Sequence, residues 1–120
     1  MAFRVEIAPR AYEDLDQIAG HIAAQGGFEQ AEMWFNGIIS AIASLRDMPS
    51  RCRIAEESEV VGQVVRCLLC GRRNRRYKVY FAIRPESRIG GMVQVFHVRH
   101  WARRPLTARE FKDLTEDLGE

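Results

Sequence analysis

The sequence has little that marks a membrane, secreted or disulfide-bonded protein. Its longest uncharged apolar stretch, residues 33–45, is 13 residues long, whereas a membrane-spanning helix needs about 20. Arg4 and Glu6 precede any apolar run, so we expect no secretory signal. Three cysteines are an odd number and cannot form a complete disulfide framework. We therefore expect a cytoplasmic protein, with no membrane partner, whose cysteines are buried thiols.

Familiar catalytic and metal-binding motifs are also missing. The chain has no GxSxG, Walker, GxGxxG or HExxH sequence. A CxxC pair, Cys67 and Cys70, and an HxxH pair, His97 and His100, are separated by 26 residues, which is longer than the spacing of about 12 in a zinc finger. Two strand residues three apart also point to opposite faces. We therefore expect neither a metal nor a cofactor.

Lysine is scarce, since 16 of the 18 basic residues are arginine. Arginine suits bidentate recognition of phosphate and carboxylate groups, although a GC-rich genome produces the same bias. The charge is segregated as well: residues 1–59 carry a net charge of −5, residues 60–109 of +11, and residues 110–120 of −4. The formal net charge of +2 is therefore small because these opposite charges largely cancel. We expect the central block to face an anionic partner.

The apolar patterns predict one α+β domain. Residues 3–8 alternate like a strand, and helical stripes follow on both sides of Gly26 and Gly27, which indicates an antiparallel helical hairpin. Strand patterns then cover residues 60–69, 77–83 and 92–99, with a basic turn at residues 71–76. The predicted order is β-α-α-β-β-β, an antiparallel sheet with the hairpin packed on one face.

A short C-terminal helix is also predicted. Thr107 and Glu110 form a capping box, and Phe111, Leu114 and Leu118 form an apolar stripe. We expect residues 1–106 to form the main domain and residues 107–120 to be a helical extension that packs on the same domain.

Strand alternation predicts one basic sheet face. If Tyr77, Val79 and Phe81 face the helices together with Met92, Phe96 and Val98, the opposite face gathers Arg66, Lys78, Tyr80, His97 and Arg99, while Val93 and Val95 point away from the helices. Such an open face has cations for phosphate, an aromatic ring for stacking and imidazoles for proton transfer. The alternative is an ordinary solvated sheet face.

Several segments together resemble the RelE/ParE superfamily of bacterial toxins. They are FRVEIAPRAYEDLDQIAGHIA, the second helix with its Trp34–Phe35 pair, the strand YKVYFAI and the segment VQVFHVRHWARRPL. The resemblance covers about residues 3–106. It implies the toxin half of a type II toxin–antitoxin module, also described as a plasmid stabilisation protein, with a cognate antitoxin as partner in a hetero-oligomer.

The resemblance leaves two mechanisms open. ParE-like toxins poison DNA gyrase with no known catalytic site, whereas RelE-like toxins are endoribonucleases that cut mRNA on the ribosome, often with a C-terminal tyrosine. No tyrosine follows Tyr80 here, which favours the ParE-like mechanism. If the protein is instead a nuclease, the candidate catalytic residues are Lys78, His97, His100 and Arg103.

The remaining candidate residues concern binding. Those for a target or a nucleic acid are Arg66, Arg72, Arg73, Arg75, Arg76, Tyr80, Arg99 and Arg104. Trp34 and Trp101 are the candidate antitoxin contacts, and the alternative for both is packing within the domain.

Overall fold

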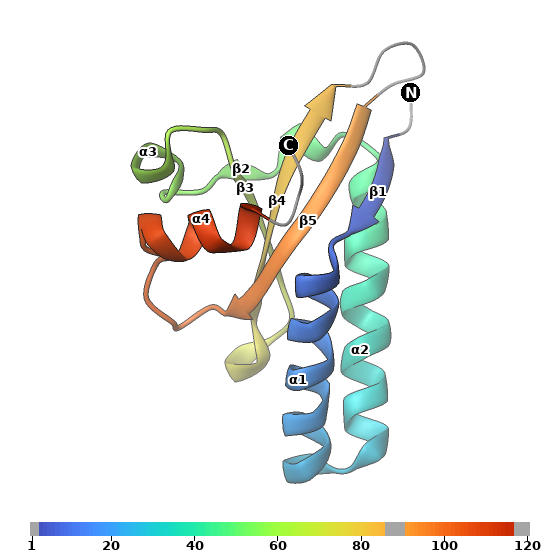
Figure 1. Cartoon of the computed structure of the whole chain (residues 1–120). Coiled ribbons are helices and arrows are strands. Elements are labelled where there is room, and N and C mark those ends of the chain that lie inside the picture. Colours follow the sequence, from blue (N-terminus) through green and yellow to red (C-terminus); the bar gives the residue numbers. More distant parts are fainter. Residues whose placement is uncertain (1–2, 86–90, 117–120) are drawn as a thin grey trace.

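The computed structural model describes residues 3–85 and 91–116, which combine a sheet with helices on its two sides (Figure 1). The chain begins with β1 (Arg4–Ile7), α1 (Pro9–Gly26) and α2 (Phe28–Ala43). Short 3-10 turns η1 (Ser44–Arg46) and η2 (Pro49–Arg51) lead to β2 (Arg53–Ile54), α3 (Ser58–Val61) and β3 (Arg66–Cys70). The turn η3 (Arg73–Arg75) precedes β4 (Tyr77–Pro85), β5 (Gly91–His100) and α4 (Ala108–Glu116).

The strands form one mostly antiparallel sheet in the order β1-β5-β4-β3-β2. The predicted meander is confirmed, since β3, β4 and β5 pair antiparallel, while β1 runs parallel to β5. The predicted hairpin is confirmed as well, because α1 ends at Gly26 and Gly27 turns the chain with φ +94°. In residues 3–85 and 91–116, no helix is long and apolar enough to cross a membrane.

The strand predicted over residues 60–69 is correct only in its second half. β3 begins at Arg66, and residues 58–61 form the short helix α3 instead. The Ser58 hydroxyl explains the difference, because it accepts a hydrogen bond from Val65 N–H and donates one to the Val65 carbonyl, both 3.0 Å long. These bonds close a loop in which Gly62, with φ +77°, ends the helix.

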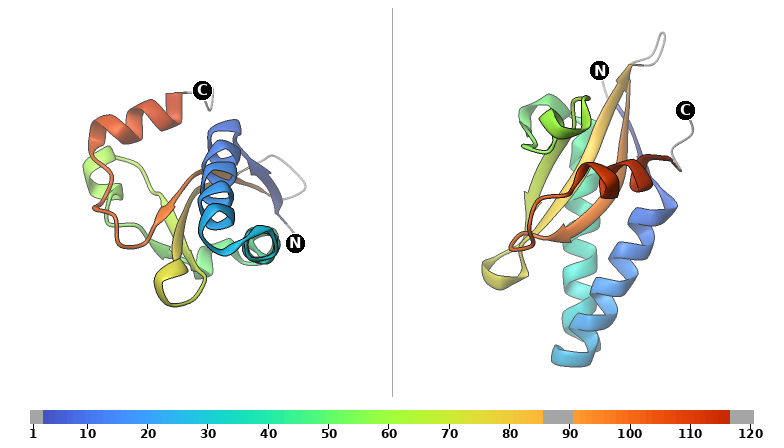
Figure 2. Two further views of the ribbon diagram at one scale, coloured as in Figure 1. Left: turned by 90° about the horizontal axis from the view of Figure 1, so that it is seen from below. Right: turned by 60° about the vertical axis from the view of Figure 1, so that its left-hand side comes forward.

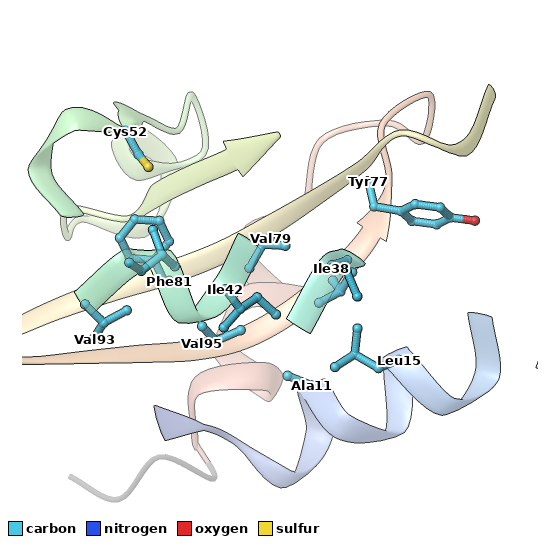
Figure 3. Close-up of a cluster of buried hydrophobic side chains, with 12 residues drawn as sticks. Ala11, Leu15, Ile38, Ile42, Cys52, Tyr77, Val79, Phe81, Val93 and Val95 are labelled. Carbon is cyan, nitrogen blue, oxygen red and sulfur yellow. The ribbon is translucent and has the colours of Figure 1, made fainter. Parts of the chain in front are cut away.

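The main core lies between the hairpin and the sheet (Figure 3). Ala11 and Leu15 of α1 and Ile38 and Ile42 of α2 supply the helical side. The sheet contributes Tyr77, Val79, Phe81, Val93, Val95 and Val98. This core explains the helical stripes of both helices, since a stripe of apolar side chains must be buried against another layer.

A bulge in β5 changes which residues face the hairpin. Tyr80 pairs with His97 and Phe81 with Val95, so Phe96 is an extra residue in the ladder. Val95 therefore faces the hairpin, whereas Phe96 packs in the second core with Tyr80. The prediction that Phe96 faces the helices while Val93 and Val95 point away is wrong for this reason.

The opposite face of the sheet is covered by α4, which lies across the sheet from α1 and α2 (Figure 2). Its Phe111 and Leu114 form a second core with Phe96, Tyr80 and Leu106. The packing predicted for the C-terminal helix is confirmed, whereas the prediction of an open basic face is wrong. Leu118 of the predicted stripe lies outside the described residues.

Candidate functional site

Tyr80, predicted as a stacking platform, is fully buried. Its hydroxyl donates a 2.7 Å hydrogen bond to Glu57 Oε2, which also accepts one from Leu106 N–H at 3.0 Å. Burial and the Glu57 bond raise the pKa of Tyr80 far above its usual range. Burial alone would raise the pKa of Glu57, but these two hydrogen bonds, one from its own backbone N–H and the charge of Lys78 together outweigh burial, and the pKa is lowered. Tyr80 and Glu57 thus form a buried polar link.

His97 is also buried, at a break in the sheet edge. β1 ends where Ile7 pairs with Val95, so the following part of β5 has no strand on that side. Asp14 of α1 takes its place: its Oδ2 lies 2.8 Å from His97 Nδ1 and accepts Val98 N–H at 3.0 Å. One carboxylate therefore holds the imidazole and caps the exposed edge of β5. The other ring nitrogen of His97 has no hydrogen-bond partner in the described part of the chain.

Arg99 is a buried cation, with an exposed fraction of 5%. One of its terminal nitrogens donates to the Arg104 carbonyl at 2.8 Å, while its Nε has no partner in the described residues. Burial, together with nearby Arg103, lowers the pKa of the Arg99 guanidinium. The positive charge at this position is therefore poorly compensated by the protein.

The four nuclease candidates do not converge on one site. Lys78 lines a hollow of about 210 Å³ together with Glu57 and Tyr80. His97, His100 and Arg103 line a different hollow, of about 470 Å³, between α1 and β5. Lys78 is therefore not brought together with the two imidazoles, which share their hollow with Arg103 instead.

Other basic candidates are held by structural contacts. Arg66 donates to the Cys52 carbonyl at 2.7 Å, and Arg75 donates to Gln30 Oε1 at 2.6 Å. Arg104 binds both carboxylate oxygens of Glu110, at 2.8 and 2.9 Å. These three side chains fasten turns and helices to one another.

Further basic candidates lie at the surface near the end of the sheet. Arg72, Arg73 and Arg103 are exposed. The Arg76 guanidinium lies 5.6 Å from the centre of the Trp101 ring, which is 43% exposed. The basic turn therefore presents arginines and an aromatic ring to solvent.

The two cysteines of the CxxC pair lie on opposite faces of β3. Cys67 packs in the core under α4, and Cys70 contacts the core under the hairpin. Burial raises the pKa of Cys67 to about 11 and that of Cys70 to about 12. In the described ranges, no three His, Cys, Asp or Glu side chains are grouped as metal ligands.

A mostly apolar groove of about 590 Å³ runs between α2 and β3. Trp34 lines it and packs edge-on against Tyr77, with 5.2 Å between ring centres. Met33 and Leu69, which sequence reasoning did not select, are largely exposed along it. Arg72 and Arg75 stand at its end. The sequence feature that could have predicted this groove is the presence of apolar residues on the solvent-facing side of α2.

Comparisons with known proteins identify the family by a family model and show a similar fold in a solved structure. The family model described as the ParE toxin of a type II toxin–antitoxin system, parDE, matches residues 5–105. A chain from a solved structure titled "Chromosomal ParDE TA system from P. aeruginosa" has a similar fold, with a TM-score of 0.63 and 22% identity over 82% of this chain and 96% of that chain. No curated protein shows significant similarity to this sequence.

Proposed function

The chain belongs to the ParE toxin family of type II toxin–antitoxin systems, and on this premise we propose that it inhibits bacterial growth by poisoning DNA gyrase. The proposal includes neutralisation by a cognate antitoxin. It also includes a cytoplasmic location, since gyrase and an antitoxin would both be met there.

The arrangement of the four nuclease candidates is the observation that supports gyrase poisoning over mRNA cleavage. Of the four, His97 is buried and bound to Asp14. Lys78 lies apart from His100 and Arg103. A general acid or base must reach its substrate within hydrogen-bond distance, so a buried His97 and a separate Lys78 are poorly placed for an mRNA-cleaving site. Inhibition by contact needs no such site.

The test is a gyrase cleavage assay with the purified protein. Gyrase, ATP and supercoiled plasmid are incubated with increasing toxin, and linear DNA is measured after denaturation of the enzyme. We expect linear DNA to accumulate with gyrase and not with topoisomerase I. Normal supercoiling and no linear DNA at excess toxin would reject the proposal. Codon-positioned cuts in mRNA on toxin-loaded ribosomes would establish the alternative activity.

We further propose that the antitoxin docks in the groove between α2 and β3. The groove exposes Met33 and Leu69 beside Trp34 and ends at Arg72 and Arg75. Such a surface suits a segment that has apolar anchors and acidic residues at one end. The outer edge of β3 is also open after Cys67, because β2 pairs only with Arg66 and Cys67.

Two glycines allow a matched test of this docking surface. Gly37 of α2 lines the groove and Gly20 of α1 does not; a Cβ at either would meet nothing within 4 Å. Leucine is a better helix former than glycine, so both variants should fold. We expect Gly37→Leu to weaken binding of the cognate antitoxin at least tenfold in titration calorimetry. Gly20→Leu should leave it unchanged. Equal affinities would place the antitoxin elsewhere.

A further inference from the structure

Two hollows lie next to each other where α1 passes β5 and the basic turn. One is about 470 Å³ and the other about 400 Å³, and they share His21, Tyr77 and His100 as walls. Five arginines also line them: Arg72, Arg73, Arg75, Arg99 and Arg103. We call the two hollows together the basic trough. It is distinct from the apolar groove, although Arg72 and Arg75 border both.

The trough has many cationic groups and little negative charge. All three histidines of the chain line it along with the five arginines. Asp14 is the one carboxylate among its lining residues, and that carboxylate is already bound by His97 Nδ1 and Val98 N–H. The field in the trough therefore attracts an anion.

Two buried nitrogens in the trough walls lack partners. His97 is 9% exposed and Arg99 5% exposed, and in the described residues neither His97 Nε2 nor Arg99 Nε finds a hydrogen-bond acceptor. Leaving a buried guanidinium uncompensated is unfavourable. Native structures rarely retain such groups without a reason. An anion in the trough would offset the charge of Arg99 through space, without contacting these two buried nitrogens.

Aromatic rings connect the trough to the surface. Tyr77 packs edge-on against His100, with ring centres 5.2 Å apart, and His100 is followed by the tilted ring of Trp101 at 6.4 Å. Trp101 is partly exposed beneath Arg76. Arginines that track a backbone and aromatic rings that accept bases or sugars are the combination that binds nucleic acid.

We propose that the basic trough binds the phosphodiester backbone of DNA. Two hollows in series, each with its own arginines, suit a chain of phosphates better than a single anion. The choice of DNA rests on the proposed function, because gyrase holds a DNA segment that the toxin would then touch directly. The five lysine or arginine residues that line the trough are all arginines, which suits bidentate phosphate binding.

The test compares two double variants that remove the same charge. Arg72→Gln/Arg103→Gln changes one exposed arginine in each hollow, and neither side chain makes a hydrogen bond or ion pair within the described part of the chain. Arg46→Gln/Arg109→Gln removes two exposed arginines outside the trough. Fluorescence anisotropy measures binding of labelled duplex DNA, single-stranded DNA and RNA at several salt concentrations.

We expect the trough variant to bind duplex DNA at least tenfold more weakly than the wild type. Its slope of log K against log salt should fall by about 1.8, since each phosphate contact contributes about 0.9. The control variant should retain the wild-type slope. No DNA binding by the wild type at low salt, or equal losses in both variants, would overturn the inference. Binding of RNA alone would overturn it too and assign the trough to that ligand.

The outcome is separable from that of the gyrase assay. A wild-type protein that produces linear DNA with gyrase but never binds DNA by itself or through the trough refutes only the trough. One that binds DNA through the trough but leaves gyrase unaffected refutes only the proposed target.

Discussion

The Tyr80 hydroxyl donates a 2.7 Å hydrogen bond to Glu57, and so joins the middle of the sheet to the segment before α3. The same carboxylate oxygen accepts Leu106 N–H, just ahead of α4. Three stretches that lie far apart in the chain are therefore fastened at one buried oxygen. This link holds α4 over the sheet face that the charge pattern had suggested would be open.

Removing the Tyr80 hydroxyl should destabilise the protein. In Tyr80→Phe the ring remains in the core, but the buried Glu57 carboxylate loses one of its hydrogen-bond donors. Hydrogen bonds to charged groups contribute about 1.5–3 kcal/mol, so we expect a loss of this size in urea unfolding. Tyr12→Phe deletes the same atom from a ring that is 47% exposed and should change stability by less than about 0.5 kcal/mol. Similar midpoints for the two variants would show that the link contributes nothing.

Glu57 should also make the protein sensitive to acid. Its pKa is lowered in the folded state, so the folded protein keeps this carboxylate charged at pH values where the unfolded chain binds a proton. This contribution to the free energy of unfolding is fully present above pH 4.5, the ordinary pKa of glutamate. It is lost as the pH falls through the lower pKa that Glu57 has in the folded protein.

The corresponding measurement is urea unfolding of the wild type and Glu57→Gln between pH 7 and pH 3. The variant should be less stable at pH 7 and lose less stability on acidification. A residual loss is expected from Glu110, whose pKa is lowered by its bond to Arg104. An equally steep loss in both proteins would mean that Glu57 does not contribute to acid sensitivity.

Gly71 should be irreplaceable at the start of the basic turn. It has φ +95°, and a Cβ there would collide with the Arg75 backbone carbonyl. Gly27 has nearly the same φ, +94°, but a Cβ there meets nothing within 4 Å. Both alanine variants carry the strain of a positive φ, about 1–3 kcal/mol. The collision should make Gly71→Ala clearly less stable in thermal unfolding, and equal melting temperatures would contradict it.

Local signals in the sequence predicted several elements because each depends on neighbouring residues. The capping box is one, since Thr107 Oγ1 accepts Glu110 N–H at 3.1 Å and Thr107 N–H reaches Glu110 Oε1 at 2.9 Å. The glycines that end α1 are another. In both cases a residue type is favoured by the backbone of a helix end within a few positions in the sequence, so a local pattern is enough to predict it.

The arrangement of the candidate site depended on contacts that no local pattern reports. The bulge at Phe96 lies within a run of apolar residues, so either face was consistent with burial. Glu57 lies close to two other acidic residues in the sequence, Glu56 and Glu59. Only the fold determines that Glu57 is the one that accepts hydrogen bonds from Tyr80 and Leu106. Asp14 meets His97 only because β1 stops short of the end of β5.

The role of α4 as a cover can be tested by removing one ring. Phe111 is 2% exposed and packs edge-on against Phe96, with ring centres 5.1 Å apart. Truncating a buried phenylalanine to alanine costs about 3–5 kcal/mol, a large part of the 5–15 kcal/mol typical of a domain. Phe28→Ala is the control, because that ring is 76% exposed. If α4 were peripheral, the two variants would unfold at the same urea concentration. If α4 completes the second core, only Phe111→Ala should lose stability and bind a dye specific for exposed apolar surface.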